Sequence, residues 1–233
     1  MLASASPDAP AEAPRLLSAD AVLPALPPSA PRQGHPRWLR ALGRWTLRAL
    51  GWRFVGGFAD RPRQVLIGAP HTSNWDGIVG LAAAAACDVG IHVFAKRQLF
   101  WGPIGWGLRA FGGVPVERSA PGGLVGRAVA ALTAGGPEFV AITPEGTRSA
   151  VAHWKTGFHR MAVEAGVPIC VVALDWGRKE IGVKGTLVPS GDFDADLAAI
   201  GALLAGVEGR HPERATLPPA GTAASAGSGS AVR

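Results

Sequence analysis

Short apolar runs alternate with stretches of helical periodicity along the middle of the chain. The runs are mostly apolar throughout, which is typical of strands covered on both faces. The expected strands are 64–69, 91–96, 113–117, 138–143, 168–174 and 184–190. The expected helices are 73–87, 103–111, 121–134, 154–165 and 193–206. This order predicts an α/β domain with a largely parallel central sheet and flanking helices.

A different pattern precedes the first strand, over residues 37–54, where an amphipathic helix is expected. One stripe of its helical wheel is apolar and rich in Trp: Trp38, Leu42, Trp45, Ala49 and Trp52. A second stripe is cationic, and a third consists of leucines: Arg37, Arg40, Arg44 and Arg48, then Leu39, Leu47 and Leu50. Trp beside cations favours a helix that lies in the interface of a bilayer. The alternative is a helix that packs on the core of its own domain.

The two ends of the chain lack this periodicity. Residues 1–35 are rich in Ala, Pro and Ser, and residues 215–233 are rich in Ala, Gly and Ser, so we expect a disordered arm and a disordered tail. The folded domain is then 36–214. The arm lacks the basic start of a signal peptide, and charged or polar residues interrupt the longest apolar run, 78–94, so we expect no spanning helix.

Composition narrows the function. Lys and Arg number 23 against 17 Asp and Glu, so the chain carries a net charge of +6 and favours anionic partners. No zinc-ligand spacing or RNA-binding aromatic signature accompanies the charge, so we expect no nucleic-acid partner. An anionic membrane surface or a phosphorylated substrate remains. The two cysteines, Cys87 and Cys170, lie in apolar stretches without metal-ligand spacing, and we expect no metal site.

Candidate chemistry lies at the carboxyl ends of the strands, where open parallel sheets bind ligands. His71 follows the strand 64–69, and Asp76 comes five residues later. One interpretation is structural, since Ser73 suits a helix N-cap and Asp76 then falls at a position that favours a carboxylate. The other is catalytic: Asp76 holds one ring nitrogen of His71, and the other nitrogen acts as a general base on a hydroxyl. The cap explains Asp76 but leaves His71 unexplained.

The segment "ITPEGTRS", residues 142–149, follows another strand. Gly146 permits a close approach of the backbone, and Thr147 and Arg148 offer hydrogen-bond donors to an anion. Two further strand ends carry cations, Lys96 and Arg118. Each cation alone is better explained as a solvated charge than as a ligand contact, but their agreement with the His71 site favours an anion-binding site.

Three segments in this order, "HTSNWD", "GGVPVER" and "PEGTRS", resemble the motifs of the glycerophospholipid acyltransferases, the family of 1-acyl-sn-glycerol-3-phosphate acyltransferase. A fourth element of that family resembles "GVPICVVAL", residues 166–174. The resemblance covers about residues 64–190. It implies a glycerol-phosphate acyltransferase-like fold and a peripheral enzyme of phospholipid biosynthesis at the cytoplasmic face of the membrane.

The resemblance also implies a reaction, the transfer of a fatty acyl group from an acyl thioester to the hydroxyl of a lysophospholipid-type acceptor. His71 would be the general base and Asp76 its orienting carboxylate. Lys96, Arg118 and Arg148 would bind a phosphate-like head group, and Glu145 and Gly146 would shape the acceptor site. Thr147 would also belong to the substrate-binding residues. No cofactor is implied beyond the donor, carried by coenzyme A or acyl carrier protein.

The alternative function is a non-catalytic lipid-binding protein of the membrane surface with the same fold. The intact pair of His71 and Asp76 argues against it. A soluble hydrolase is a third possibility, but the chain has no G-x-S-x-G nucleophile motif.

Overall fold

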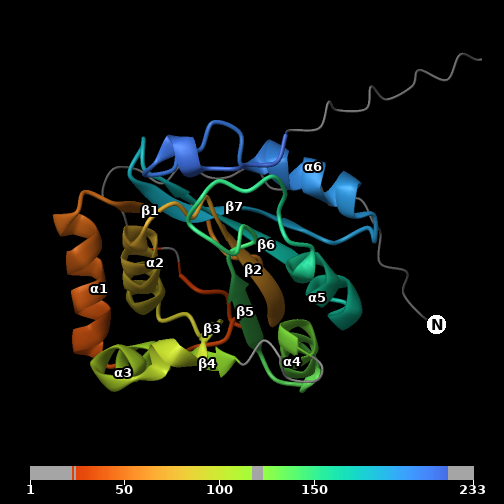
Figure 1. Cartoon of the computed structure of the whole chain (residues 1–233). Helices are drawn as coiled ribbons and strands as arrows, with labels where there is room; N and C mark the ends of the chain where they lie inside the picture. The colour runs from red at the N-terminus through yellow and green to blue at the C-terminus, as the bar shows by residue number, and fades with distance from the viewer. Residues whose placement is uncertain (1–22, 24, 117–122, 220–233) are drawn as a thin grey trace, which may run out of the picture.

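The computed structural model describes residues 23, 25–116 and 123–219 of the chain (Figure 1). Its centre is a seven-stranded sheet in the order β1-β7-β6-β2-β5-β3-β4. The strands are β1 (Arg53–Val55), β2 (Arg63–Ala69), β3 (His92–Lys96), β4 (Gly113–Val116), β5 (Glu138–Ile142), β6 (Ile169–Asp175) and β7 (Glu180–Leu187). Only the β6–β7 pairing is antiparallel among those described. The predicted α/β fold with a largely parallel sheet is confirmed.

The helices fall between the strands as predicted, with ends that shift by a few residues. They are α1 (Arg37–Ala49), α2 (Asn74–Cys87), α3 (Gly102–Ala110), α4 (Gly123–Thr133), α5 (Gly157–Ala165) and α6 (Phe193–Leu203), with short 3-10 turns at Arg97–Phe100 and Pro212–Arg214. No helix in the described ranges has both the length and the apolar character that a bilayer crossing needs.

Both faces of the sheet are covered. Side chains on a strand alternate between faces, so Leu66 packs with α2 in one apolar cluster while Val65 and Ile67 pack with α4, α5 and α6 in the other. Figure 1 shows the same division, with α1 and α2 on one side of the sheet and α4 and α5 on the other. This double cover explains why the strands read as continuous apolar runs.

The predicted helix over 37–54 is wrong in its second half. The helix ends at Ala49, Gly51 takes a left-handed conformation with φ of 72°, and Arg53–Val55 forms β1 beside β7. Trp52 consequently leaves the exposed Trp stripe and is buried at 4% exposure. Trp52 faces the core because the chain leaves the helix before this residue in order to pair β1, at the edge of the sheet, with β7.

The remaining helix packs on its own domain, as the second interpretation of its amphipathic pattern expects. Gly43 and Leu47 are buried, and Gly43 lies so close to the backbone of Ala82 in α2 that a side chain there would collide with it. The opposite stripe, with Trp38, Leu42 and Trp45, is exposed. Helix α1 therefore packs on the domain and still presents tryptophan to the surroundings.

Some residues that were predicted to belong to the disordered arm and tail pack against the domain instead. Leu26 and Ala30 are buried, and the backbone N–H of His35 donates to Asp88 Oδ1 at 2.7 Å. At the other end, Trp154 Nε1 donates to the carbonyl oxygen of Thr216 at 2.6 Å. The prediction from composition is therefore wrong for residues 25–35, which were assigned to the arm, and for residues 215–219, which were assigned to the tail. Residues 1–22 and 220–233, for which disorder is predicted, lie outside the described residues.

Candidate active site

The central strand β2 delivers the "HTSNWD" segment to the carboxyl edge of the sheet. β2 ends at Ala69, the Ala69–Pro70 peptide is cis, and α2 begins at Asn74, so His71 lies in the short connection between them. β2 pairs in parallel with β5 on one side and β6 on the other. The loops that follow these two strands therefore flank His71.

Asp76 is the most firmly held side chain of this site. Its Oδ2 accepts hydrogen bonds from the backbone N–H groups of Thr72 and Ser73, both at 2.7 Å. Its Oδ1 accepts from Trp176 Nε1 at 2.7 Å and from Ser73 Oγ at 3.1 Å. The carboxylate thus caps α2, as the structural interpretation requires.

The same carboxylate faces the His71 ring. Asp76 Oδ2 lies 3.4 Å from His71 Nδ1, and the Asp76 side chain is 1% exposed. Burial favours the neutral acid, but the hydrogen bonds from His71, Ser73, Trp176 and Thr72 outweigh it, so the pKa of Asp76 lies below its usual value. Asp76 is therefore an anion at neutral pH. The Asp76 carboxylate therefore caps α2 and pairs with His71 at the same time.

His71 keeps access to solvent, with 23% of its side chain exposed. With Nδ1 toward Asp76, Nε2 has no hydrogen-bond partner among the residues that the structure describes. A neutral imidazole in this position can take a proton at Nε2 while a neighbouring carboxylate stabilises the cation that forms. This is the geometry that a general base with an orienting carboxylate requires.

Glu145 ties the "PEGTRS" loop to His71. Its Oε2 accepts a hydrogen bond from the backbone N–H of His71 at 2.7 Å, whereas its buried Oε1 has no partner in the described part of the chain. Burial raises the pKa of Glu145 to about 7, against the opposing effect of the hydrogen bond from His71. Glu145 therefore positions the backbone of the candidate base, a contact beyond the predicted role in shaping the acceptor site.

The rest of this loop is open to solvent. Gly146 has φ of 67°, a conformation that favours glycine, and a side chain there would meet Lys155. Thr147 and Arg148 are exposed, and the Thr147 Oγ1 accepts from the backbone N–H of Ser149 at 3.4 Å. Within the described ranges Arg148 has no ion-pair partner, which leaves its guanidinium available to an anion.

Two predicted site residues cannot be placed beside these. Lys96 ends β3, but its side chain is outside what the structure describes, and Arg118 lies outside the described residues altogether. A cavity of about 620 Å³ does occupy the region just beyond β3 and β4. Its lining includes three cations, Arg97, Arg109 and Arg127. The described chain contains no group of three or more His, Cys, Asp or Glu side chains that could hold a metal ion.

Sequence reasoning missed Trp176 and the segment that follows α6. Trp176 comes directly after β6, so the same strand-end argument that selected His71 could have found it. Arg210 stacks on Trp75 and Trp176, with 5.2 and 4.9 Å from its guanidinium carbon to the ring centres. The backbone N–H of His211 donates to Thr72 Oγ1 at 3.2 Å. Residues 210 and 211 belong to no motif, and no sequence signal marked them.

Comparison with known proteins bears on this site. No curated protein matches the chain. The crystal structure of PlsC, a 1-acyl-sn-glycerophosphate acyltransferase from Thermotoga maritima, is similar over 67% of this chain and 70% of that chain, with 21% identity and a TM-score of 0.49. The family model described as Acyltransferase matches residues 54–175, more than half of the chain, including the His71, Asp76 and Glu145 positions. The chain belongs to the Acyltransferase family, which confirms the prediction of an acyltransferase enzyme.

Proposed function

We propose that this acyltransferase moves a fatty acyl group from an acyl thioester to the hydroxyl of a lysophospholipid-type acceptor, at the cytoplasmic face of a membrane. The observation that carries the proposal is the pair of His71 and Asp76. A buried carboxylate fixed by four other hydrogen bonds lies 3.4 Å from one ring nitrogen, and the other nitrogen is available at the carboxyl edge of the sheet.

The reaction follows from the roles of these two side chains. The acceptor hydroxyl gives its proton to His71 Nε2 as its oxygen attacks the carbonyl carbon of the thioester. Asp76 stabilises the imidazolium that results. The tetrahedral intermediate then breaks its C–S bond, and the leaving thiolate takes the proton from His71, which regenerates the neutral base. A positioned base of this kind contributes roughly 10²–10⁴ in rate.

The acyl group would pass directly from donor to acceptor, because neither cysteine of the chain is suited to act as a nucleophile. Burial raises the pKa of Cys87 and of Cys170 to about 12, so neither is a thiolate at neutral pH. Acyl transfer through a cysteine is therefore disfavoured. The donor is a thioester of coenzyme A or of acyl carrier protein, and the chain needs no further cofactor.

Cations at the same edge support an acceptor with a phosphate. Arg148 is exposed and unpaired within the described ranges, and three arginines line the cavity beyond β3 and β4. Guanidinium groups bind phosphate through charge-assisted hydrogen bonds. Lys96 and Arg118 remain proposed members of this head-group site.

Helix α1 supports attachment to the membrane. Trp38 and Trp45 are 65% and 66% exposed, and Leu42 lies between them on the same face. Large apolar side chains beside a cationic face are typical of helices that lie in the bilayer interface. Attachment would bring the domain to the surface where its acceptor and product reside.

The test is to incubate the purified full-length protein with labelled acyl-coenzyme A or acyl carrier protein and a panel of lysolipids. We expect a diacyl product from at least one phosphate-bearing lysolipid, and a loss of at least about 100-fold in turnover for His71→Ala. His92→Ala is the matched control, because His92 begins β3 at the opposite edge and pairs with Glu138 at 2.7 Å. A folded His71→Ala protein with wild-type turnover contradicts the proposed base, and lipid binding without product supports the non-catalytic alternative.

A further inference from the structure

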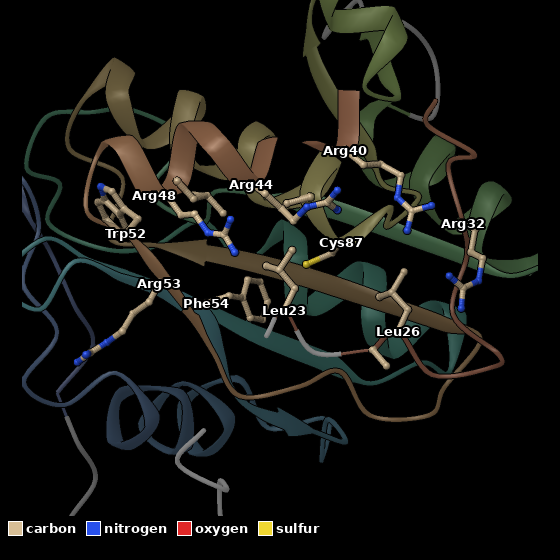
Figure 2. Close-up of a pocket in the computed structure, with 13 residues that line it drawn as sticks. Leu23, Leu26, Arg32, Arg40, Arg44, Arg48, Trp52, Arg53, Phe54 and Cys87 are labelled. Atoms are coloured by element: carbon tan, nitrogen blue, oxygen red, sulfur yellow. The ribbon is translucent and has the colours of Figure 1, made fainter. Parts of the chain in front are cut away.

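A second cavity, of about 550 Å³, lies beside α1 and away from the candidate active site (Figure 2). Its wall includes the far end of α2 at Ala86 and Cys87. Asp76 is in the first turn of that helix, so the rise per residue places Cys87 roughly 16 Å farther along the axis. The cavity is thus a separate site, and the proposed acyl transfer does not account for it.

Five arginines line this cavity: Arg32, Arg40, Arg44, Arg48 and Arg53. Arg53 is neutralised by Glu180 at 2.7 Å, and in Figure 2 its guanidinium points away from the others. Arg40 approaches Asp88 only to 3.9 Å, and its buried Nε has no hydrogen-bond partner in the described chain. Arg32, Arg44 and Arg48 have no ion-pair partner among the described residues. A cluster of arginines that carboxylates do not neutralise can bind an anion.

The floor of the cavity is apolar. It is formed by Leu26, Leu47, Phe54, Ala86 and Cys87. Figure 2 shows the side chains of Arg44 and Arg48 extending from α1 above Cys87 and Leu23. An inorganic anion would neutralise the arginines but would leave the apolar floor exposed to water. A ligand with a negative head and an apolar tail would satisfy both parts.

The position of the cavity on α1 indicates where such a ligand comes from. Arg40, Arg44 and Arg48 recur every four residues and share one face of the helix. The neighbouring face carries the exposed Trp38 and Trp45. If these tryptophans insert into the interface, the arginine face lies at the level of the lipid head groups.

We propose that this cavity binds one anionic phospholipid of the membrane surface, with its phosphate on Arg44 and Arg48 and its acyl chains over the apolar floor. The site would hold a membrane lipid that is not a substrate. It rests on the proposed membrane attachment and is independent of the proposed chemistry at His71.

The test measures binding of dihexanoyl phosphatidylglycerol, as a monomer in solution, to the full-length protein by isothermal titration calorimetry. We expect Arg44→Gln/Arg48→Gln to weaken binding by about tenfold or more, the equivalent of 1.4 kcal/mol. The control Arg37→Gln/Arg61→Gln removes the same charge from exposed positions outside the cavity and should change the affinity by less than about twofold. Arg44→Lys/Arg48→Lys keeps the charge and should bind more tightly than the Gln pair.

Other ligands separate the head group from the tail. Dihexanoyl phosphatidylcholine and glycerol 3-phosphate should each bind at least about tenfold more weakly, since one lacks net charge and the other lacks a tail. Equal loss in both Gln pairs would indicate diffuse charge attraction and overturn the proposal. Equal affinity for glycerol 3-phosphate would overturn it in favour of a free-anion site. No acyl transfer is measured, so failure of the proposed activity leaves the result interpretable.

Discussion

Trp176 donates a hydrogen bond from its indole Nε1 to Oδ1 of Asp76 at 2.7 Å, across a sequence separation of 100 residues. The ring of Trp176 packs edge-on against Trp52, with 4.9 Å between the ring centres. Since Trp176 follows β6 and Asp76 follows β2, two neighbouring strand ends hold the carboxylate. This contact orients Asp76 from the side that His71 does not reach.

We predict that Trp176→Phe lowers turnover by roughly tenfold, the equivalent of about 1.4 kcal/mol in the barrier. The variant keeps an aromatic ring but loses the N–H donor, so the pKa of Asp76 should rise toward its usual value. Trp52→Phe is the control, because it removes similar ring area without touching Asp76. Turnover and urea unfolding of both variants check this prediction, and equal turnover in the two would assign the effect to packing alone.

Asp76 should matter to catalysis in a way that another buried Asp does not. We predict that Asp76→Asn lowers turnover by about 10²–10⁴, because the amide cannot stabilise the imidazolium. Asp196 is the matched control, since it is also buried and lies 2.7 Å from a histidine, His159. Asp196→Asn should destabilise the fold and leave turnover per folded molecule near wild type. If both variants lose activity equally, the loss belongs to the fold and not to the base.

Features that depend on residues close together in the sequence could be predicted, whereas features that depend on residues far apart in the sequence could not. The parallel strands and His71 were predictable because apolar runs and strand-end loops are local patterns. Trp52 was not, since its burial depends on β1 pairing with β7 about 127 residues later. The contacts of Arg210 could not be predicted for a similar reason. Arg210 reaches Trp75 and Trp176 only through the packing of the chain after α6. The predicted contact of Asp76 with His71 was found, whereas the role of Glu145 in holding the His71 backbone required the register of β2 against β5.

Glu145 should make stability depend on pH in a known direction. Its pKa is raised from 4.5 to about 7 mainly by burial, so between these values the folded state binds a proton that the unfolded state has released. Stability should therefore fall as pH rises from 4.5 to 7 and level off above, by at most about 3 kcal/mol. We predict that Glu145→Gln removes this part of the dependence.

Urea unfolding at pH 5, 6, 7 and 8 tests the prediction through the difference between wild type and Glu145→Gln. Glu164→Gln, an exposed position on α5, controls for the change of a carboxylate to an amide. A difference that is constant across the four pH values would show that Glu145 is ionised like an ordinary carboxylate in the folded state.

Arg148 tests the head-group site directly. We predict that Arg148→Ala raises the KM for a phosphate-bearing acceptor about 10- to 100-fold, as expected for a lost hydrogen bond to a charged group, and changes the donor KM much less. Arg160→Ala is the control, because Arg160 is exposed on α5 and pairs with Glu164 at 3.2 Å. Steady-state kinetics with both substrates varied give the two KM values. An unchanged acceptor KM would exclude Arg148 from the head-group site.

The exposed stripe of α1 gives the prediction for membrane attachment. Trp38 and Trp45 are exposed while Gly43 and Leu47 of the same helix are buried on the domain, so the tryptophans can be replaced without removing core contacts. We predict that Trp38→Ser/Trp45→Ser reduces co-sedimentation with anionic liposomes at least about tenfold. The control is Val163→Ser/Val188→Ser, which changes two other exposed apolar side chains, at 44% and 72% exposure.

Salt separates the two contributions to this attachment. Arginines near an anionic surface contribute about 1 kcal/mol each and are screened by salt, whereas the insertion of tryptophan is not. Wild-type binding should therefore weaken in 0.5 M salt, as screening predicts, but persist in part, and the Trp variant should be released completely. Wild-type levels of co-sedimentation for the Trp variant at both salt concentrations would mean that α1 only packs on α2 and that another surface meets the membrane.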